Sequence, residues 1–436
     1  MSLNQSIQQI KRVYFLVTAL RWLAVGLIVP IFVLFMQSRD MNLMQIGIIM
    51  GLYSVTVILL ELPTGGLADA LGRKKVTLLA HAVDILSSLI ILFSFSFWGF
   101  LMGMSLMGVA RALNSGALDA WYVDSLQTAD PDIDLQPALA QAETVVLLAL
   151  GIGTLTGGAL PTLFSSLPAA ENTLISPLST TMLASLVIQL VLLAVIAKAV
   201  HEAPREEADQ ANWRTAFSSV PAIVIDALTL TRQNHSLPLL MGATLIGGFT
   251  LAGVETFWQP HFADLLGGTA EKSWLFGLVM AISFLAGVGG NMLSIPLSKR
   301  LNHHYALVAG LARALQSVAL LAMALLQPVV AFAGGFWAFY GGNALNSSPH
   351  ATLVNREIPA SRRSAMLSTQ SLASYAGSFL GSVLLGAIAE NSSISNAWIL
   401  AAIVSMVSLV LYAGVARQQP RISMAHDEDV PLPESS

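Results

Sequence analysis

Apolar runs of about 20 residues follow one another along almost the whole chain, each long enough to cross ~30 Å of hydrocarbon as a helix. Short charged or Pro/Gly-rich stretches separate them. The pattern predicts an all-α membrane protein with twelve transmembrane helices. The predicted helices cover residues 14–36, 43–63, 76–96, 98–119, 139–162, 177–200, 237–258, 273–295, 304–325, 327–347, 364–389 and 393–416.

The composition supports the same class. Of the 436 residues, 55% are hydrophobic and 11% are charged, whereas about 25% of the residues of a soluble domain are charged. We therefore expect the chain to lie in a lipid bilayer. The chain has no Cys, which excludes disulfides and thiolate metal sites, and its net charge of −4 does not indicate nucleic-acid binding. We expect no cofactor, no metal and no nucleic-acid partner.

Lysine and arginine are distributed unequally between the two sides of the predicted topology. With Met1 inside, only Arg39 and Lys272 fall outside, and sixteen basic residues fall inside. Basic loops stay in the cytoplasm, so we expect both termini there. No small-residue cleavage site follows the first apolar run, which is expected to remain as the first helix. The inside residues are Lys11, Arg12, Arg73, Lys74, Lys75, Lys198, Arg205, Arg214, Arg232, Lys299, Arg300, Arg356, Arg362, Arg363, Arg417 and Arg421.

The longest hydrophilic segment, residues 201–235, lies midway along the chain. We expect it to be a cytoplasmic linker between two six-helix halves, residues 1–200 and 236–418. A short surface helix opened by Pro221 and a disordered linker are both compatible with its pattern. Residues 419–436 are too polar to pack and are expected to form a disordered tail.

An internal repeat also indicates two halves. Ala112-Leu113-Asn114-Ser115 recurs 232 positions later as Ala344-Leu345-Asn346-Ser347. Residues 67–71 align with residues 297–301 at an offset of 230. Transporters with duplicated halves bind their solute between the halves, near the middle of the bilayer.

The loop after the second predicted helix resembles motif A of the major facilitator superfamily, G-x-L-a-D-r-x-G-r-k. It matches at Gly66, Leu67, Asp69, Gly72, Arg73 and Lys74, with Ala70 in place of the usual basic residue. The resemblance implies the fold of that superfamily and a conformational latch. In the latch, Asp69 meets the start of the eleventh helix near Ser364, and Arg73 pairs with Asp119 or Asp124. An ordinary positively charged inside loop is the alternative.

Three further segments resemble sequences of the superfamily. Residues 111–116 resemble motif B, R-x-x-q-G-x-g, with Asn114 in place of Gln and Ser115 in place of Gly. Residues 115–126 resemble a variant found in a largely uncharacterised branch of the superfamily. Residues 153–158 resemble the antiporter motif C but lack its Gly-Pro pair, and close helix packing through small residues is the alternative reading.

Four ionisable residues lie within the predicted spans at similar depth: Arg21, Asp84, Arg111 and Glu143. A charge at bilayer depth costs ~2.5–3.5 kcal/mol on insertion scales, so each needs a partner, a cavity or a task. We expect these residues to form a proton-coupling site, with Asp84 as the favoured carrier; structural ion pairs are the alternative.

Polar residues on helix faces indicate where a solute could bind. We expect the substrate cavity to include Thr18, Asn114, Tyr340, Asn343 and Asn346. The last three recur every three residues along one predicted helix, and packing in the protein core is the alternative explanation of that spacing. Glu255 is expected at the outer membrane interface. His81 and Asp84 share a helix face, but no third ligand accompanies them, which argues against a metal site.

The function indicated is transport. Neither H-E-x-x-H, G-x-S-x-G nor a P-loop occurs, which argues against a membrane enzyme or a primary pump. The resemblance implies a secondary transporter of a small-molecule solute in the bacterial inner membrane. Proton-coupled export by a monomer is our first choice. A nutrient importer or uniporter is the runner-up, and a non-transporting receptor is a distant third.

Overall fold

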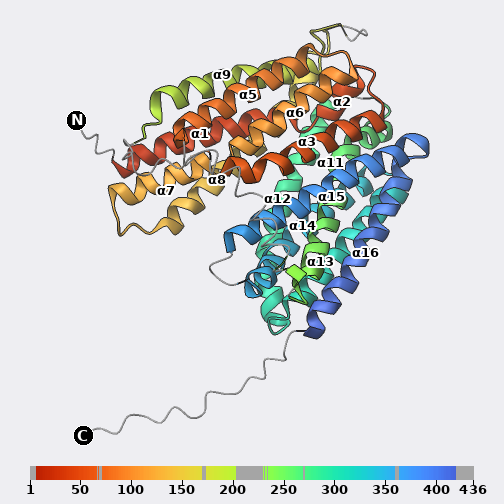
Figure 1. Ribbon diagram of the computed structural model, residues 1–436. Coiled ribbons are helices and arrows are strands. Elements are labelled where there is room, and N and C mark those ends of the chain that lie inside the picture. The colour runs from red at the N-terminus through yellow and green to blue at the C-terminus, as the bar shows by residue number, and fades with distance from the viewer. Residues whose placement is uncertain are drawn as a thin grey trace.

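The computed structural model in Figure 1 describes residues 6–65, 67, 71–168, 173–202, 229, 231–232, 234–268, 271–358 and 363–418, and all regular structure in them is helical. The helices form two bundles. The first bundle holds α1 (Ile7–Ile28), α2 (Phe32–Gln37), α3 (Leu43–Gly65), α5 (Arg73–Phe93), α6 (Phe97–Leu113), α7 (Ala117–Ala129), α8 (Leu135–Leu163) and α9 (Ser179–Ala199). The second bundle holds α11 (Leu237–Leu266), α12 (Ser273–Arg300), α13 (Tyr305–Leu325), α14 (Val329–Arg356), α15 (Arg363–Asn391) and α16 (Ile394–Gln418).

Nine helices in the described part of the chain are long and apolar enough to cross a membrane. They are α3, α5, α8, α9, α11, α12, α13, α15 and α16. Outside this set, α1 carries Lys11, Arg12 and Arg21, α6 has only 17 residues, and α14 contains three Asn. The chain is thus multi-pass, whereas the twelve-span topology and the side of the termini stay predictions.

Two predicted helices are interrupted, and for both the prediction of one continuous helix is wrong. The first apolar run divides into α1 and α2 around Pro30, which has no N–H to continue the helical ladder. The fourth run divides into α6 and α7, with Asn114 following the last residue of α6. Gly116 then has a φ of 78°, a left-handed conformation that glycine adopts without steric cost.

We call the end of each bundle that carries Ile7 in the first bundle or Gln418 in the second the terminal end. The opposite end, with residues 38–42 of the first bundle and 267–268 of the second, is the far end. In Figure 1 the bundles lie close together around α2, α3 and α11 and diverge toward the start of α1 and the end of α16. Between the bundles, α3 packs along α15 and α8 packs along α12.

The contact between α8 and α12 is made by backbone. A Cβ atom added to Gly158 would lie 2.5 Å from the backbone nitrogen of Gly277, so neither position has room for a side chain. The Ser273 hydroxyl donates to the Gly158 carbonyl at 2.8 Å, and the hydroxyl oxygens of Thr162 and Ser273 are 2.8 Å apart. The small residues of the motif C-like segment thus allow close helix packing at the far end.

Gln259 of α11 fastens the broken first helix to the second bundle. Its side-chain oxygen accepts from the Val33 N–H at 2.9 Å, and its side-chain nitrogen donates to the Val29 carbonyl at 2.8 Å. Gln259 is only 2% exposed, so it satisfies backbone groups that the helix break would otherwise leave buried and unpaired. Ile31 and Leu34 join the large aromatic core of the second bundle beside it. The far end is therefore closed in this structure.

Candidate functional site

A cavity of about 460 Å³ lies between the two bundles. Helices of the first bundle (α1, α2, α3, α5, α6 and α9) and of the second bundle (α11, α12, α14 and α15) contribute to its lining. Much of the wall is apolar, including Trp22, Met50, Met107, Trp258 and Met280. Its volume lies in the range of small-molecule sites, roughly 300–1,000 Å³.

Four charged side chains line this cavity. Arg21, Asp84 and Arg111 come from the first bundle, and Glu255 comes from the second. Glu255 is exposed although it lies well inside α11, and Arg111, in the last turn of α6, is exposed as well; both face the cavity. Within the part of the chain that the structure describes, none of the four belongs to an ion pair. Unpaired charges at this depth are costly and indicate a functional site.

The charged groups and three tyrosines share one space. The electrostatic neighbours of Arg21 include Arg111 and Asp84. Tyr53 of α3 has Arg111, Asp84 and Glu255 among its neighbours. Arg111 also interacts with the hydroxyl of Tyr375 in α15, and Glu255 is a neighbour of Tyr340 in α14. The cavity thus presents cations, anions and neutral hydrogen-bonding groups to one bound molecule.

Comparison with known proteins identifies the family. Residues 14–350 match the sequence profile of the Major Facilitator Superfamily. This chain belongs to the major facilitator superfamily. That superfamily is one of membrane transporters, whose members are in general not enzymes.

Individual relatives agree with this assignment. The uncharacterised MFS-type transporter YxaM of Bacillus subtilis (strain 168) is 23% identical over 93% of this chain and 96% of its own length. The inner membrane transport protein YajR of Escherichia coli (strain K12) is 32% identical over 24% of this chain and 22% of its own length.

Solved structures show the same fold. The nucleoside transporter NupG has a TM-score of 0.73 and 14% identity, covering 96% of this chain and 100% of that one. A POT family transporter in complex with 5-aminolevulinic acid has a TM-score of 0.67 and 14% identity, covering 93% and 98%. At these identities the likeness concerns the fold alone.

The structure places only part of the predicted proton-coupling and substrate residues at the cavity. Of the proton-coupling set, Arg21, Asp84 and Arg111 line the cavity, whereas Glu143 lies exposed on α8 and does not. Of the predicted substrate set, Asn114 and Tyr340 line it.

The other predicted substrate residues point elsewhere. Thr18 is buried in α1 away from the cavity lining. Asn343 accepts a hydrogen bond from the Gln316 side chain at 3.1 Å, and Asn346 donates to the Ala309 carbonyl at 3.1 Å. Neither Asn lines the cavity, because their face of α14 is turned toward α13.

Glu255 was missed as a cavity residue, because its helix is longer than expected. The predicted helix ends at residue 258, but α11 continues to Leu266, which moves Glu255 from the membrane interface into the helix interior. Ala252, Glu255, Thr256 and Gln259 all line the cavity, at spacings of three and four. Residues at these spacings lie on one face of a helix, so the sequence alone could have placed Glu255 on the same face as the other three.

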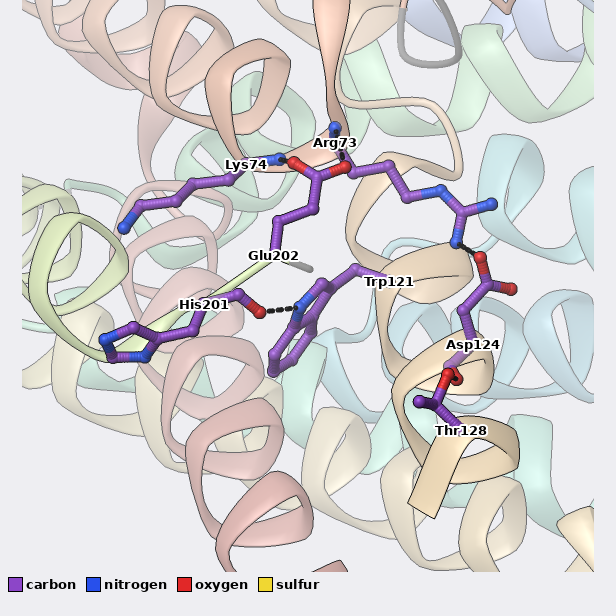
Figure 2. A network of polar contacts seen from close by, with 7 residues as sticks. All are labelled: Arg73, Lys74, Trp121, Asp124, Thr128, His201 and Glu202. Atoms are coloured by element: carbon purple, nitrogen blue, oxygen red, sulfur yellow. Dashed lines mark hydrogen bonds and ion pairs between the residues drawn. The ribbon is translucent and has the colours of Figure 1, made fainter. Parts of the chain in front are cut away.

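Two residues of the predicted motif A latch, Arg73 and Asp124, belong to a polar network at the terminal end of the first bundle (Figure 2). Arg73 forms an ion pair with Asp124 of α7, while Asp119 accepts a hydrogen bond from the Tyr14 hydroxyl at 2.6 Å. Gly72, with a φ of 98°, directly precedes α5. Gly66, Asp69 and the side chain of Ser364 lie outside the described residues, so the latch stays a prediction.

The first residues of the predicted linker join this network. The Glu202 carboxylate accepts from the backbone N–H groups of Arg73 at 2.9 Å and Lys74 at 3.2 Å. An acid is favourable there because the first N–H groups of a helix have no partner within the helix. The Trp121 indole donates to the His201 carbonyl at 2.9 Å (Figure 2). The start of the linker is therefore fixed to both α5 and α7.

The described residues contain no cluster of three or more His, Cys, Asp or Glu side chains that could hold a metal ion.

Proposed function

We propose that this protein is a secondary active transporter that exports a small molecule across the bacterial inner membrane in exchange for protons. The observation that carries the proposal is the cavity between the bundles. Its lining includes Arg21, Arg111, Asp84 and Glu255, and none of these forms an ion pair within the described residues. The bacterial relatives, YxaM and YajR, are an MFS-type transporter and an inner membrane transport protein, which supports this location. We propose that it works as a monomer, because the two bundles that line the cavity belong to the same chain.

The proposed topology has twelve spans in two halves, residues 1–200 and 236–418, with residues 201–235 and both termini in the cytoplasm. In that orientation the closed far end faces outward. The present conformation then suits loading of the solute from the cytoplasmic side. Export follows when the bundles rock about the cavity, opening the contacts between α8 and α12 and closing the terminal end.

Asp84 is the proposed proton carrier. Arg21 is its electrostatic neighbour, and both belong to helices that meet the cavity. A movement of α1 relative to α5, or a solute that binds Arg21, changes how well the Asp84 charge is stabilised. Because a ligand shifts an equilibrium only through its different affinity for the two states, this change can couple proton binding to the transport cycle.

The test uses proteoliposomes. A solute is first selected by thermal stabilisation of the purified protein over a broad compound library. Its flux is then measured together with proton movement, for the wild type, Asp84→Asn and Glu143→Gln. We expect Asp84→Asn to abolish solute-driven proton movement while solute binding remains measurable. Glu143→Gln should behave as the wild type, because Glu143 lies outside the cavity.

Other outcomes decide between the alternatives. Normal proton movement in Asp84→Asn would make Asp84 a structural counter-ion of Arg21. Co-transport of solute and protons in one direction would indicate a nutrient importer, and flux independent of the pH gradient would indicate a uniporter. Binding without any flux would indicate a receptor.

A further inference from the structure

We infer that the cavity binds an amphoteric solute with an apolar body, whose acidic group lies between Arg21 and Arg111 and whose amine is bound by Glu255. The inference rests on the proposed function for its role in transport. It names the substrate class of the cavity, and binding alone can test it.

The two arginines provide the site for the acidic group. Arg21 and Arg111 are electrostatic neighbours of the same sign, so each raises the free energy of the other in the enclosed cavity. Neither is in an ion pair within the described residues. Asp84 and Asp119 are electrostatic neighbours of Arg21, and Arg111 has Glu61 as an electrostatic neighbour and the Tyr375 hydroxyl as a hydrogen-bond partner. None of these acids forms an ion pair with either arginine among the described residues. A carboxylate between the two guanidinium groups relieves their repulsion and can accept paired hydrogen bonds.

Glu255 provides the site for the amine. Among the described residues no Arg or Lys is an electrostatic neighbour of Glu255, in contrast to Asp84 with Arg21. Its known neighbours are the tyrosines Tyr53 and Tyr340. A carboxylate beside aromatic rings is a favourable environment for an alkylammonium group, which it binds through charge-assisted hydrogen bonds and cation–π contact.

The wall between the two charged regions is apolar. Trp22, Met107, Trp258 and Met280 contribute to it, and methionine side chains adapt to differently shaped ligands. A solute that lacks the amine leaves Glu255 without an ion-pair partner among the described residues, and one that lacks the acid leaves both arginines without one. The amphoteric molecule satisfies both regions and, because Glu255 belongs to the second bundle, it links the two bundles.

The probes are L-phenylalanine, L-tryptophan and L-leucyl-L-phenylalanine, each also as its N-acetyl derivative and its methyl ester. Thermal unfolding of the purified full-length chain in detergent gives an apparent affinity for each form. We expect the amphoteric form of at least one probe to stabilise the protein more than either masked form. The wild type alone decides this point, so it does not depend on the folding of a variant.

Variants then assign the two regions. Glu255→Gln should weaken binding of the amphoteric form about tenfold or more, and leave the N-acetyl form within a few-fold, because an ionic hydrogen bond is lost. Arg111→Gln should affect the N-acetyl form and spare the methyl ester. Glu271→Gln, on the exposed far-end loop, is the matched control.

Three results would overturn the inference. They are no stabilisation by any amphoteric probe, equal stabilisation by an amphoteric probe and one of its masked forms, and equal loss of all three forms in Glu255→Gln. Selective binding without flux in proteoliposomes would leave this inference standing and remove the proposed transport function. Flux of a purely anionic or cationic solute, with no preference for amphoteric solutes, would overturn this inference and leave the proposed transport function standing.

Discussion

One face of α11 carries two residues with different tasks. Glu255 is open to the cavity, whereas Gln259, one turn closer to the far end, is buried against the break in the first helix. Both are polar residues in a largely apolar helix, and each is explained by what it faces. The carboxylate faces the space for a ligand, and the carboxamide faces two backbone groups of the other bundle.

Replacing Gln259 tests the second task. In Gln259→Leu the Val29 carbonyl and the Val33 N–H lose their partner in a buried place, at a cost of about 1–3 kcal/mol for each unsatisfied group. We expect a lower unfolding temperature in detergent. Gln136→Leu, at an exposed position of α8, is the control and should stay close to the wild type. Equal unfolding temperatures for both variants would show that the Gln259 bridge does not stabilise the closed far end.

Among individual residues, those of the cavity in the first bundle were predicted from the sequence better than those in the second. Arg21, Asp84 and Arg111 stand out as single charges within apolar runs. Residues 340, 343 and 346 were predicted to share one face, yet each step of three turns 60° short of a full turn, so Asn346 points about 120° away from Tyr340. Glu255 was misplaced because the predicted helix ends at residue 258, whereas α11 continues to Leu266.

Among the elements, the repeated tetrapeptide shows how context decides a helix. Ala-Leu-Asn-Ser ends α6 at Asn114 in the first bundle but lies inside α14 in the second. In the first bundle Gly116 follows and adopts the left-handed conformation that starts α7 on a new axis. The sequence predicts both helices from their apolar runs. It does not predict the break, because a lone glycine is also tolerated within a helix.

The conformation of Gly116 leads to a matched pair of variants. Gly116→Ala places a Cβ in a left-handed conformation, which costs about 1–2 kcal/mol, although nothing lies within 4 Å of that atom. Gly151→Ala, inside α8 and with equally open space, should be neutral or stabilising by up to about 1 kcal/mol. Thermal unfolding of both variants measures the difference. A destabilised Gly151→Ala, or an unaffected Gly116→Ala, would contradict this account of the break.

At the scale of the whole molecule, the structure shows one conformation, in which the far end is closed. The closed interface joins α8 to α12 and α3 to α15, and the cavity lies between the same bundles. Alternating access requires these contacts to separate once in every cycle. A covalent link across them should therefore stop transport.

The absence of native Cys makes such a link simple to introduce. In Thr162→Cys/Ser273→Cys the two sulfurs replace hydroxyl oxygens that are 2.8 Å apart, on opposite sides of the interface. We expect a disulfide to form under mild oxidation, transport to stop, and activity to return on reduction. Each single variant, treated with the same oxidant, is the control. Full activity of the cross-linked protein would show that the far end does not open at this contact.

Topology is a second property of the whole molecule. His235 and Gly267 are exposed residues before and after α11. His235→Cys should be protected from an impermeant thiol reagent added outside whole cells, and Gly267→Cys should react. Ser236 is less suitable because it is buried. Labelling at residue 235 but not at residue 267 would reverse the proposed orientation.

The Gln259 bridge also bears on how the membrane stays sealed. When the far end opens, the Val29 carbonyl and the Val33 N–H leave their carboxamide partner, and water is the only replacement that can satisfy them at once. Opening and wetting of the far end are then a single event. While the bridge holds, this stretch stays dry and offers protons no chain of water molecules along which to leak. The break in the first helix would thus help to preserve the proton gradient on which the proposed exchange depends.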